Sequence, residues 1–215
     1  MNKLLKSIAF LILITLISFP TFALSKESET LKEALSLHSN KKYEQAFVLF
    51  EKEAHKGNAQ AQYILGQIYQ RGIGTDKDEE LAIHWYKKAS KQKFSAASYN
   101  LGAHYDREAW LTTHAPLKNK RYKIAFDWFK TSAEQGNTDA IYKVGEYFLF
   151  GGQGVPKDYK QAAEWFKKAV DKSHPEAYYQ LSRLYYHGHG VTKDFDKAAD
   201  LSKKAANYYF NKGRK

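Results

Sequence analysis

His187 and His189 are the residues whose type and spacing come nearest to a chemical site in this chain. They flank Gly188, and two imidazoles supply half of a zinc site, which needs three or four ligands. No carboxylate or further histidine lies at a useful spacing, so the pattern favours a turn. The chain also lacks the His-Glu-x-x-His and phosphate-loop patterns. The sequence therefore predicts no catalytic residue, no metal ligand and no cofactor, and it indicates recognition by surface side chains.

A block of residues that recurs along the chain must position any such surface. Its first landmark is an alanine that opens a predicted first helix: Ala61, Ala97, Ala140 and Ala177. Its second landmark is an alanine in a predicted second helix: Ala46, Ala82, Ala125, Ala162 and Ala198. Within each series the interval is 36 or 37 residues, except for one interval of 43. This regularity indicates a true repeat with a single seven-residue insertion.

Each copy has the pattern of two amphipathic helices. Apolar residues at helical spacing in one first helix are Ala61, Leu65, Ile68 and Tyr69. Those in the following second helix are Ala82, Trp85, Tyr86 and Ala89. One pair cannot cover its own apolar face, but stacked pairs share a core, so we predict an all-α fold of antiparallel helix pairs.

Glycine and aspartate mark the crossings and ends of these helices. Gly66, Gly102 and Gly145 fall in mid-helix, where glycine costs about 1 kcal/mol relative to alanine, so we expect a close helix crossing there. The paired turn glycines are expected to have positive φ. Aspartates that follow these turns are predicted to cap the second helices: Asp78, Asp158 and Asp194.

The order Ala-x-Tyr-x-Leu-Gly-x-x-Tyr-x-x-Gly-x-Gly, followed by Asp and then Ala-x-x-Trp-Tyr-x-Lys-Ala, resembles the Sel1-like repeat, a relative of the tetratricopeptide repeat. The resemblance covers residues 43–206. It implies a right-handed α-α superhelix, or solenoid, of about ten helices that serves in protein interactions, often as an adaptor of exported bacterial type. The expected units are a capping helix pair (24–57), repeats at 58–93, 94–136, 137–173 and 174–207, and a terminal cap (208–215).

Comparison of the copies separates scaffold from candidate binding residues. The second residue after each opening alanine is always tyrosine, which we predict to be core: Tyr63, Tyr99, Tyr142 and Tyr179. The third, sixth and tenth residues vary completely, although they share one helical face. They are Ile64, Gln67, Arg71, Asn100, Ala103, Arg107, Lys143, Glu146, Phe150, Gln180, Arg183 and His187. We predict that this variable row lines a concave groove; the alternative is a solvated face without a ligand.

The insertion, residues 107–120, is the second candidate for recognition. It replaces the glycine turn and the aspartate cap with an apolar stretch that contains Trp110, flanked by basic residues. One hypothesis is an exposed loop in which Trp110 anchors a partner, since Trp and Arg are frequent at binding hot spots. The other is that the first helix runs on through Leu111 and that Trp110 packs on the next repeat.

The amino terminus has the pattern of a secretory signal. Lys3 and Lys6 precede an apolar run, residues 8–19, and small residues then lead to Ala23. We predict a signal peptide over residues 1–23, cleaved after Ala23, and a periplasmic or secreted protein. A membrane anchor is disfavoured because the run is shorter than the ~20 residues that span a bilayer.

Composition limits the partners further. The chain has no cysteine, but it has 16 Tyr, 13 Phe and 4 Trp, so packing rather than disulfides must hold it together. Without the two signal-peptide lysines, the formal net charge falls from +11 to +9. Such a protein is attracted to anionic envelope material or to a partner that is acidic in part, while export disfavours nucleic acid.

Several functions fit these patterns. The first hypothesis is an exported, non-enzymatic scaffold that binds a protein or peptide, such as an envelope or cell-wall enzyme or a host protein. The resemblance also implies an enzyme acting on peptidoglycan or β-lactams, because cysteine-rich exported relatives have been proposed to bind or hydrolyse penicillins; those relatives carry paired cysteines. A third hypothesis is binding of anionic glycan or lipid head groups. The aromatic segment 208–210 suggests docking of a partner or self-association.

Overall fold

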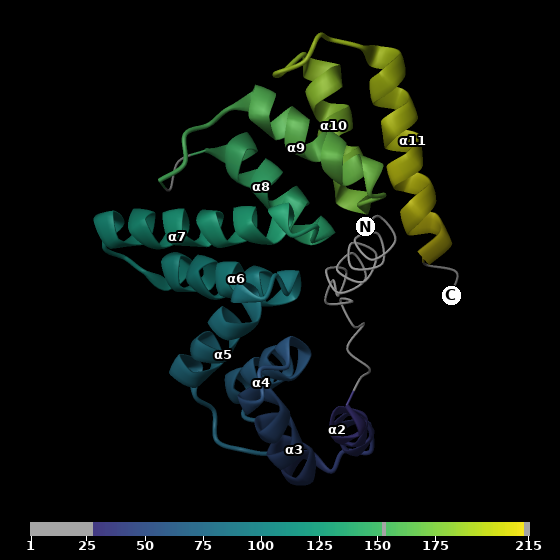
Figure 1. Ribbon diagram of the computed structural model, residues 1–215. Helices are drawn as coiled ribbons and strands as arrows, with labels where there is room; N and C mark the ends of the chain where they lie inside the picture. Colours follow the sequence, from purple (N-terminus) through teal and green to yellow (C-terminus); the bar gives the residue numbers. More distant parts are fainter. Residues whose placement is uncertain (1–27, 152–153, 213–215) are drawn as a thin grey trace, which may run out of the picture.

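The computed structural model describes residues 28–151 and 154–212, which form ten α-helices and no β-strand. The helices alternate as first and second members of antiparallel pairs (Figure 1). The first two pairs are α2 (Glu29–Ser39) with α3 (Tyr43–His55) and α4 (Ala59–Arg71) with α5 (Glu79–Lys91). The next two are α6 (Ser95–Leu111) with α7 (Ala115–Glu134) and α8 (Thr138–Phe150) with α9 (Tyr159–Asp171). The last is α10 (Pro175–His187) with α11 (Phe195–Lys212).

The helix pairs are stacked along an arc that has α2 at one end and α11 at the other (Figure 1). Each helix makes its main contacts with the helices before and after it in the sequence. A fold built from such neighbour contacts is a solenoid, so the predicted all-α architecture is confirmed. The predicted signal peptide, residues 1–23, lies outside the described residues. The stretch predicted as a terminal cap begins inside α11, which runs unbroken from Phe195 to Lys212.

A buried carboxylate of α3 joins the two helices of the first pair. Glu53 of α3 is 3% exposed; it accepts hydrogen bonds from Lys56 Nζ at 2.8 Å and from Ser28 Oγ at 2.7 Å. These bonds, that of Lys56 first, hold the pKa of Glu53 below its ordinary value. Ser28 also caps α2, because its hydroxyl accepts from the backbone N–H of Leu31. One serine therefore joins the start of the array to its second helix.

Each inner repeat is held together by a glycine on the first helix that lies under an aromatic ring of the second. A Cβ added to Gly145 would lie 2.6 Å from Cε1 of Phe166, which is fully buried. The same contact joins Gly102 to Phe129 and Gly66 to Tyr86. The predicted close crossing is therefore confirmed, and the ring that requires it is now identified.

The predicted helix ends are also confirmed. The side-chain oxygen of Asp78 accepts from the N–H of Leu81 at 2.9 Å, and Asp158 and Asp194 cap α9 and α11 in the same way. The turn glycines have positive φ, as at Gly190, where φ is 69°. A Cβ there would lie 2.2 Å from the Tyr159 backbone, so this turn packs directly on the start of the preceding second helix.

The insertion at residues 107–120 is mostly helical rather than a loop. α6 runs through Leu111, and α7 begins at Ala115, so both helices of this repeat are longer than their counterparts. The hypothesis that the first helix runs on through Leu111 is thus confirmed. The accompanying expectation that Trp110 packs on the next repeat is wrong, because Trp110 is 72% exposed.

The recurring tyrosines do not all belong to the core. Tyr63, Tyr99 and Tyr142 are half-buried and contact rings of their own second helices. Tyr179 is 53% exposed, so its prediction as core is wrong. The reason is local, because α11 has Ser202 where the inner repeats place an aromatic ring.

Substitution of Gly145 by alanine tests the crossing. We expect Gly145→Ala to lower the free energy of unfolding by about 1–3 kcal/mol, because the added methyl group overpacks the contact with Phe166. At an open helical site the same type of change is neutral or favourable, since alanine is the best helix former. Chemical denaturation measures the difference.

Ser36→Ala on the exposed side of α2 is the control for helix propensity and should leave stability unchanged or slightly higher. A second change, Phe166→Leu in the Gly145→Ala background, should recover part of the loss by making room for the methyl group. A Gly145→Ala protein as stable as the parent would show that the crossing does not depend on this glycine.

Candidate binding surface on the first helices

Neighbouring first helices face each other across crevices. The crevice between α2 and α4 has a volume of about 220 Å³, that between α6 and α8 about 150 Å³, and that between α8 and α10 about 220 Å³. In Figure 1, α4 and α8 lie nearer the inside of the arc than α5 and α9. Members of the variable row that line these crevices are Ile64, Gln67, Arg71, Lys143, Glu146, Phe150, Gln180, Arg183 and His187. The fold thus gathers most of the row on the surface that the first helices share.

The α2–α4 crevice is largely apolar. Ile64 and Gln67 are half-buried in it, beside Phe50 of α3, while Arg71 is exposed at the end of α4. Gln67 Nε2 donates to the hydroxyl of Tyr63 at 3.0 Å, so its amide is already engaged within α4. This crevice offers an apolar floor with one cation at its rim.

The α6 part of the row is less basic than the sequence suggests. Arg107 Nη2 lies 3.2 Å from Glu79 Oε1, and Lys77 Nζ lies 2.9 Å from the same oxygen. The hydrogen bond from Lys77, with the Arg107 charge adding to it, keeps the pKa of Glu79 below its ordinary value. Arg107 is therefore partly neutralised, and the remaining row members on α6 are the half-buried Asn100 and the exposed Ala103.

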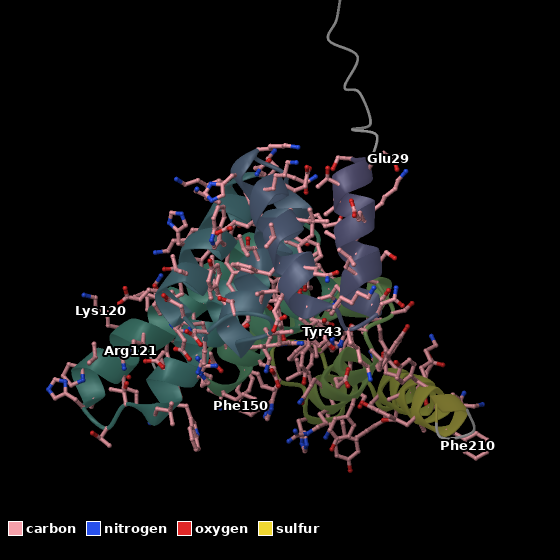
Figure 2. The ribbon with its side chains drawn as sticks, turned by 90° about the horizontal axis from the view of Figure 1, so that it is seen from below. Glu29, Tyr43, Lys120, Arg121, Phe150 and Phe210 are labelled. Carbon is pink, nitrogen blue, oxygen red and sulfur yellow. The ribbon has the colours of Figure 1, made fainter. Side chains whose placement is uncertain are left out.

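The α8 part of the row carries an internal ion pair and an exposed ring. Lys143 Nζ lies 2.7 Å from Glu146 Oε2, and the hydroxyl of Tyr142 donates to Glu146 Oε1 at 3.0 Å. Burial opposes the charge on Lys143, but the bond to Glu146 outweighs it, so the pKa of Lys143 is raised. Phe150, at the end of α8, is 65% exposed. Figure 2 shows Phe150 at the edge of the molecule opposite Glu29.

Besides the Lys143–Glu146 ion pair, the α6–α8 crevice contains a hydrogen bond that joins its two helices. The hydroxyl of Tyr147 on α8 donates to the carboxylate of Asp106 on α6, and both residues are half-buried. Burial and then this bond to the carboxylate raise the pKa of Tyr147. The contact fixes the distance between two neighbouring first helices and so shapes the crevice.

The α8–α10 crevice collects cations, imidazoles and rings from three elements. Gln180, Arg183 and His187 of α10 face Phe150 of α8 across it. Residues that the variable row did not include complete the lining: Lys157, Tyr159 and His189. His189 stacks on Tyr159 with ring centroids 4.5 Å apart, and it stacks on His187 at 5.4 Å.

A further comparison of repeats would have found two of these additional residues, His189 and Tyr159, but not Lys157, because each copy with a Gly-x-Gly turn has a lysine before its capping aspartate. His189 is the variable residue of the Gly-x-Gly turn, which is Ile73 in the first full copy. Tyr159 begins its second helix, where the first full copy has Glu79. Both positions vary between copies, and the turns bring them beside the end of the first helix. Restricting the comparison to the first helices therefore missed one side of the crevice.

Trp110 lies apart from these crevices, on the extension of α6. It is exposed together with Leu111 and Leu117, which lies on α7. Arg121 of α7 links the two helices of this repeat, because its guanidinium donates to the carbonyl of Glu108 on α6 at 3.3 Å. Figure 2 shows Lys120 and Arg121 on this projecting part of the molecule. The apolar tip is therefore a surface separate from the row.

The described part of the chain contains no group of three or more His, Asp or Glu side chains that could hold a metal ion. His187 and His189 lie beside one another at the α10 turn, as the sequence comparison suggested, and they face rings and cations rather than carboxylates. Among the described helices, none has the length and apolarity to cross a membrane.

The repeat model described as "Sel1 repeat" matches residues 59–94, 95–137, 138–174 and 175–207. The chain belongs to the Sel1 repeat family. Two solved structures share its fold: the protective antigen c5321 of uropathogenic Escherichia coli, which displays an SLR fold, and a Sel1 repeat protein of Oxalobacter formigenes. Their TM-scores are 0.74 and 0.71, each is 26% identical, and each match covers 83% of this chain, with 38% and 71% of the other chain.

Similar Sel1 repeat segments occur inside larger proteins. A chitin synthase regulator of Malassezia restricta is 31% identical over 137 residues, which cover 60% of this chain and 9% of that protein. Protein sel-1 homolog 2 of Homo sapiens is 34% identical over 95 residues, which cover 44% of this chain and 14% of that protein. The chain thus spans a small part of these relatives. Sel1 repeat proteins are protein–protein interaction scaffolds, and their fold is generally non-enzymatic.

Removal of one hydroxyl tests the link between α6 and α8. We expect Tyr147→Phe to lower the free energy of unfolding by about 1–3 kcal/mol, because it leaves the half-buried Asp106 carboxylate without its donor. Tyr186→Phe, at a tyrosine that is 55% exposed, is the matched control and should change stability little. Equal effects of the two changes in chemical denaturation would show that the Asp106 bond adds nothing.

Proposed function

We propose that this protein is an exported, non-enzymatic scaffold that binds an acidic segment of a partner protein on the inner surface of its first helices. The α8–α10 crevice is the centre of the proposed site. The observation that carries the proposal is its lining: Lys157, Arg183, His187 and His189 contribute cations or imidazoles, and none of the described lining residues is a carboxylate.

The positive charge of this crevice is available to a ligand, unlike that of the α6–α8 crevice. In the α6–α8 crevice, Lys143 is paired with Glu146, and Asp106 is a second acidic group. Among the described residues, Lys157 and Arg183 have no ion pair with a carboxylate; each lies over a tyrosine ring. A carboxylate of a partner could therefore pair with these two cations without displacing a carboxylate of this chain. Such charge complementarity speeds the association of the two proteins and fixes how the partner is aligned in the crevice.

The crevice also offers an apolar contact. Phe150 of α8 and Tyr159 of α9 both line it, and Phe150 is largely exposed. An exposed ring of this size at the edge of a charged hollow is typical of an anchoring contact, since aromatic residues are frequent at hot spots. The ligand that fits both features is an acidic peptide that carries an apolar or aromatic side chain next to its carboxylates.

The family supports a protein partner. Sel1 repeat proteins serve as interaction scaffolds, and one similar protein is named as a regulator of an enzyme, chitin synthase. By analogy, we extend the proposal to a partner in the envelope, such as a cell-wall enzyme. The formal net charge of +11, which remains +9 without Lys3 and Lys6, supports attraction to an acidic partner.

Peptide binding tests the proposed site. The probe is a fluorescent peptide with alternating glutamate and phenylalanine, and the comparison peptide has glutamine in place of every glutamate. We expect Lys157→Gln with Arg183→Gln, or Phe150→Ala alone, to weaken binding of the acidic peptide by about tenfold or more, since each removes a contact worth at least ~1.4 kcal/mol. Fluorescence anisotropy at physiological ionic strength measures the dissociation constants.

The matched control removes the same charge from the second helices, with Lys87→Gln and Lys130→Gln, both at exposed sites. This protein should bind the acidic peptide as the parent does. Equal loss in both double variants would instead indicate non-selective attraction of anions, as expected for a glycan or lipid head-group binder. Equal affinity of the parent for the acidic and the glutamine peptides would contradict the proposal.

Export is tested separately. We expect a bacterial cell that expresses the whole chain to release a protein that begins at Leu24, because the signal peptidase should cut after Ala23. N-terminal sequencing of the periplasmic or extracellular fraction reads this directly. Replacing Ala23 by a bulky residue such as phenylalanine should block cleavage. A chain that keeps Met1 and remains in the cytoplasmic fraction would show that residues 1–23 do not direct export.

A further inference from the structure

The α6–α8 and α8–α10 crevices are neighbours that share one wall. Helix α8 lies between α6 and α10 along the arc (Figure 1). It therefore forms one side of each crevice, and Phe150 at its end lines both of them. A peptide that occupies the α8–α10 crevice and contacts Phe150 is thus beside the α6–α8 crevice as well.

The two crevices differ in the sign of their charge. The α8–α10 crevice contains Lys157 and Arg183 and no described carboxylate. The charged residues that line the α6–α8 crevice are Asp106, Glu146 and Lys143, so two carboxylates there face a single cation. One crevice is therefore net basic, and its neighbour is net acidic.

Asp106 is the residue that makes the α6–α8 crevice acidic. Glu146 is already paired with Lys143, at 2.7 Å. Asp106 accepts a hydrogen bond from the hydroxyl of Tyr147 through Oδ1, but its Oδ2 accepts none from the described residues. No cation of the described part of the chain forms an ion pair with it. One oxygen of this carboxylate is therefore open to a further donor.

The arginines nearest to Asp106 have other partners. Arg107 Nη2 lies 3.2 Å from Oε1 of Glu79, and Arg121 Nη2 lies 3.7 Å from Oε2 of Glu108. Asp106 itself is half-buried, so it has lost part of its hydration. A cation that a ligand brings to Asp106 gains more there than at a fully exposed carboxylate, because the electrostatic interaction is screened less.

The cation that fits this position is an ammonium or guanidinium group. The described residues include no group of three or more His, Asp or Glu side chains that could hold a metal ion. A lysine or arginine side chain, in contrast, needs only one carboxylate to form a charge-assisted hydrogen bond. A protein segment that already contacts the α8–α10 crevice can supply such a side chain.

The separation of the two crevices sets the spacing of charges in the ligand. They are separated by α8, and a helix with its side chains is about 10–12 Å across. An extended chain advances about 3.3–3.6 Å per residue, so about three residues lead from one crevice to the other. The second charged group of the ligand should follow the first at this interval.

We propose that the partner segment carries a lysine or arginine that pairs with Asp106, about three residues from the carboxylates that occupy the α8–α10 crevice. This inference rests on the proposed function, which assigns the α8–α10 crevice to those carboxylates. An apolar residue between the two charged groups contacts Phe150, which lines both crevices. Asp106 is then a specificity-determining residue, and the surface recognises the order of charges in the segment as well as its net charge.

Such a surface distinguishes a protein segment from a uniform polyanion. An anionic glycan or a lipid surface presents the same sign of charge to both crevices. Its attraction to Lys157 and Arg183 is therefore accompanied by repulsion from Asp106. The α6–α8 crevice thus disfavours ligands that the positive net charge of the chain would otherwise attract.

Two pairs of fluorescent peptides with blocked termini test this inference. The first pair is Lys-Gly-Phe-Glu-Gly-Glu and the same peptide with glutamine in place of lysine. The second pair has the reverse order, because a segment can run through the crevices in either direction. In one of the two pairs we expect the lysine peptide to bind about fivefold more tightly than the glutamine peptide, although lysine reduces its negative charge. Fluorescence anisotropy at physiological ionic strength measures the dissociation constants.

Asp106→Asn removes the charge but keeps an acceptor for the hydroxyl of Tyr147. We expect this variant to bind the lysine and glutamine peptides equally, and to bind the glutamine peptide at least as tightly as the parent does. Asp171→Asn is the matched control, because it makes the same change at an exposed residue of α9. It should keep the preference of the parent. Thermal unfolding of both variants checks that the fold is retained.

The outcomes separate this inference from the proposed function. A parent protein that binds the lysine and glutamine peptides of both pairs equally, yet binds them better than peptides without glutamate, would overturn the bipolar ligand alone. A preference for lysine that survives Asp106→Asn would overturn the role of Asp106. If none of the acidic peptides binds to the parent, the proposed function is wrong, and this inference is wrong with it.

Discussion

The contact between a glycine of the first helix and an aromatic ring of the second is the constraint on which this solenoid depends. At Gly66, Gly102 and Gly145 there is no room for a methyl group, because the ring of the partner helix fills the space directly above the backbone. That contact sets the separation of the two helices and buries the largest side chains of the array. Because the chain has no cysteine, this packing rather than disulfides holds the array together.

The same contact explains how the two ends of the array differ from its middle. At the start, α2 and α3 are joined through the Glu53 carboxylate and its two donors, and the outer side is solvated. In the last repeat the glycine and the ring are both replaced by serine, which leaves Tyr179 without its usual neighbour and opens a hollow beside exposed rings. The hollow is lined mostly by apolar and aromatic side chains of α10 and α11.

The proposed peptide site depends on how the scaffold distributes charge. Sequence comparison placed three arginines in the variable row, but these are not equivalent in the structure. Arg107 lies beside Glu79, whereas Arg183 lies in a crevice lined by no described carboxylate and shared with Lys157 and two imidazoles. A solenoid keeps its first helices at nearly constant separation, so the ligand preference of each crevice follows from which variable side chains face it. A scaffold of this kind can therefore bind one acidic segment at one repeat while the other repeats act only as framework.

The sequence by itself determined the repeat, its two helices, the capping aspartates, the crossing glycines and the row of variable residues. These follow from short-range rules, because helical periodicity and backbone conformation depend on residues within one or two turns. Only the tertiary structure decided which of those residues share a crevice and which are neutralised by a partner from another helix. Phe150 ends α8, Lys157 lies in the turn after α8, and His189 lies in the turn after α10; only the stacking of the repeats brings His189 to the hollow that the other two share. Trp110 likewise lies on a helix, as one hypothesis held, but whether its ring was covered depended on the neighbouring repeat, and no local rule specifies that contact.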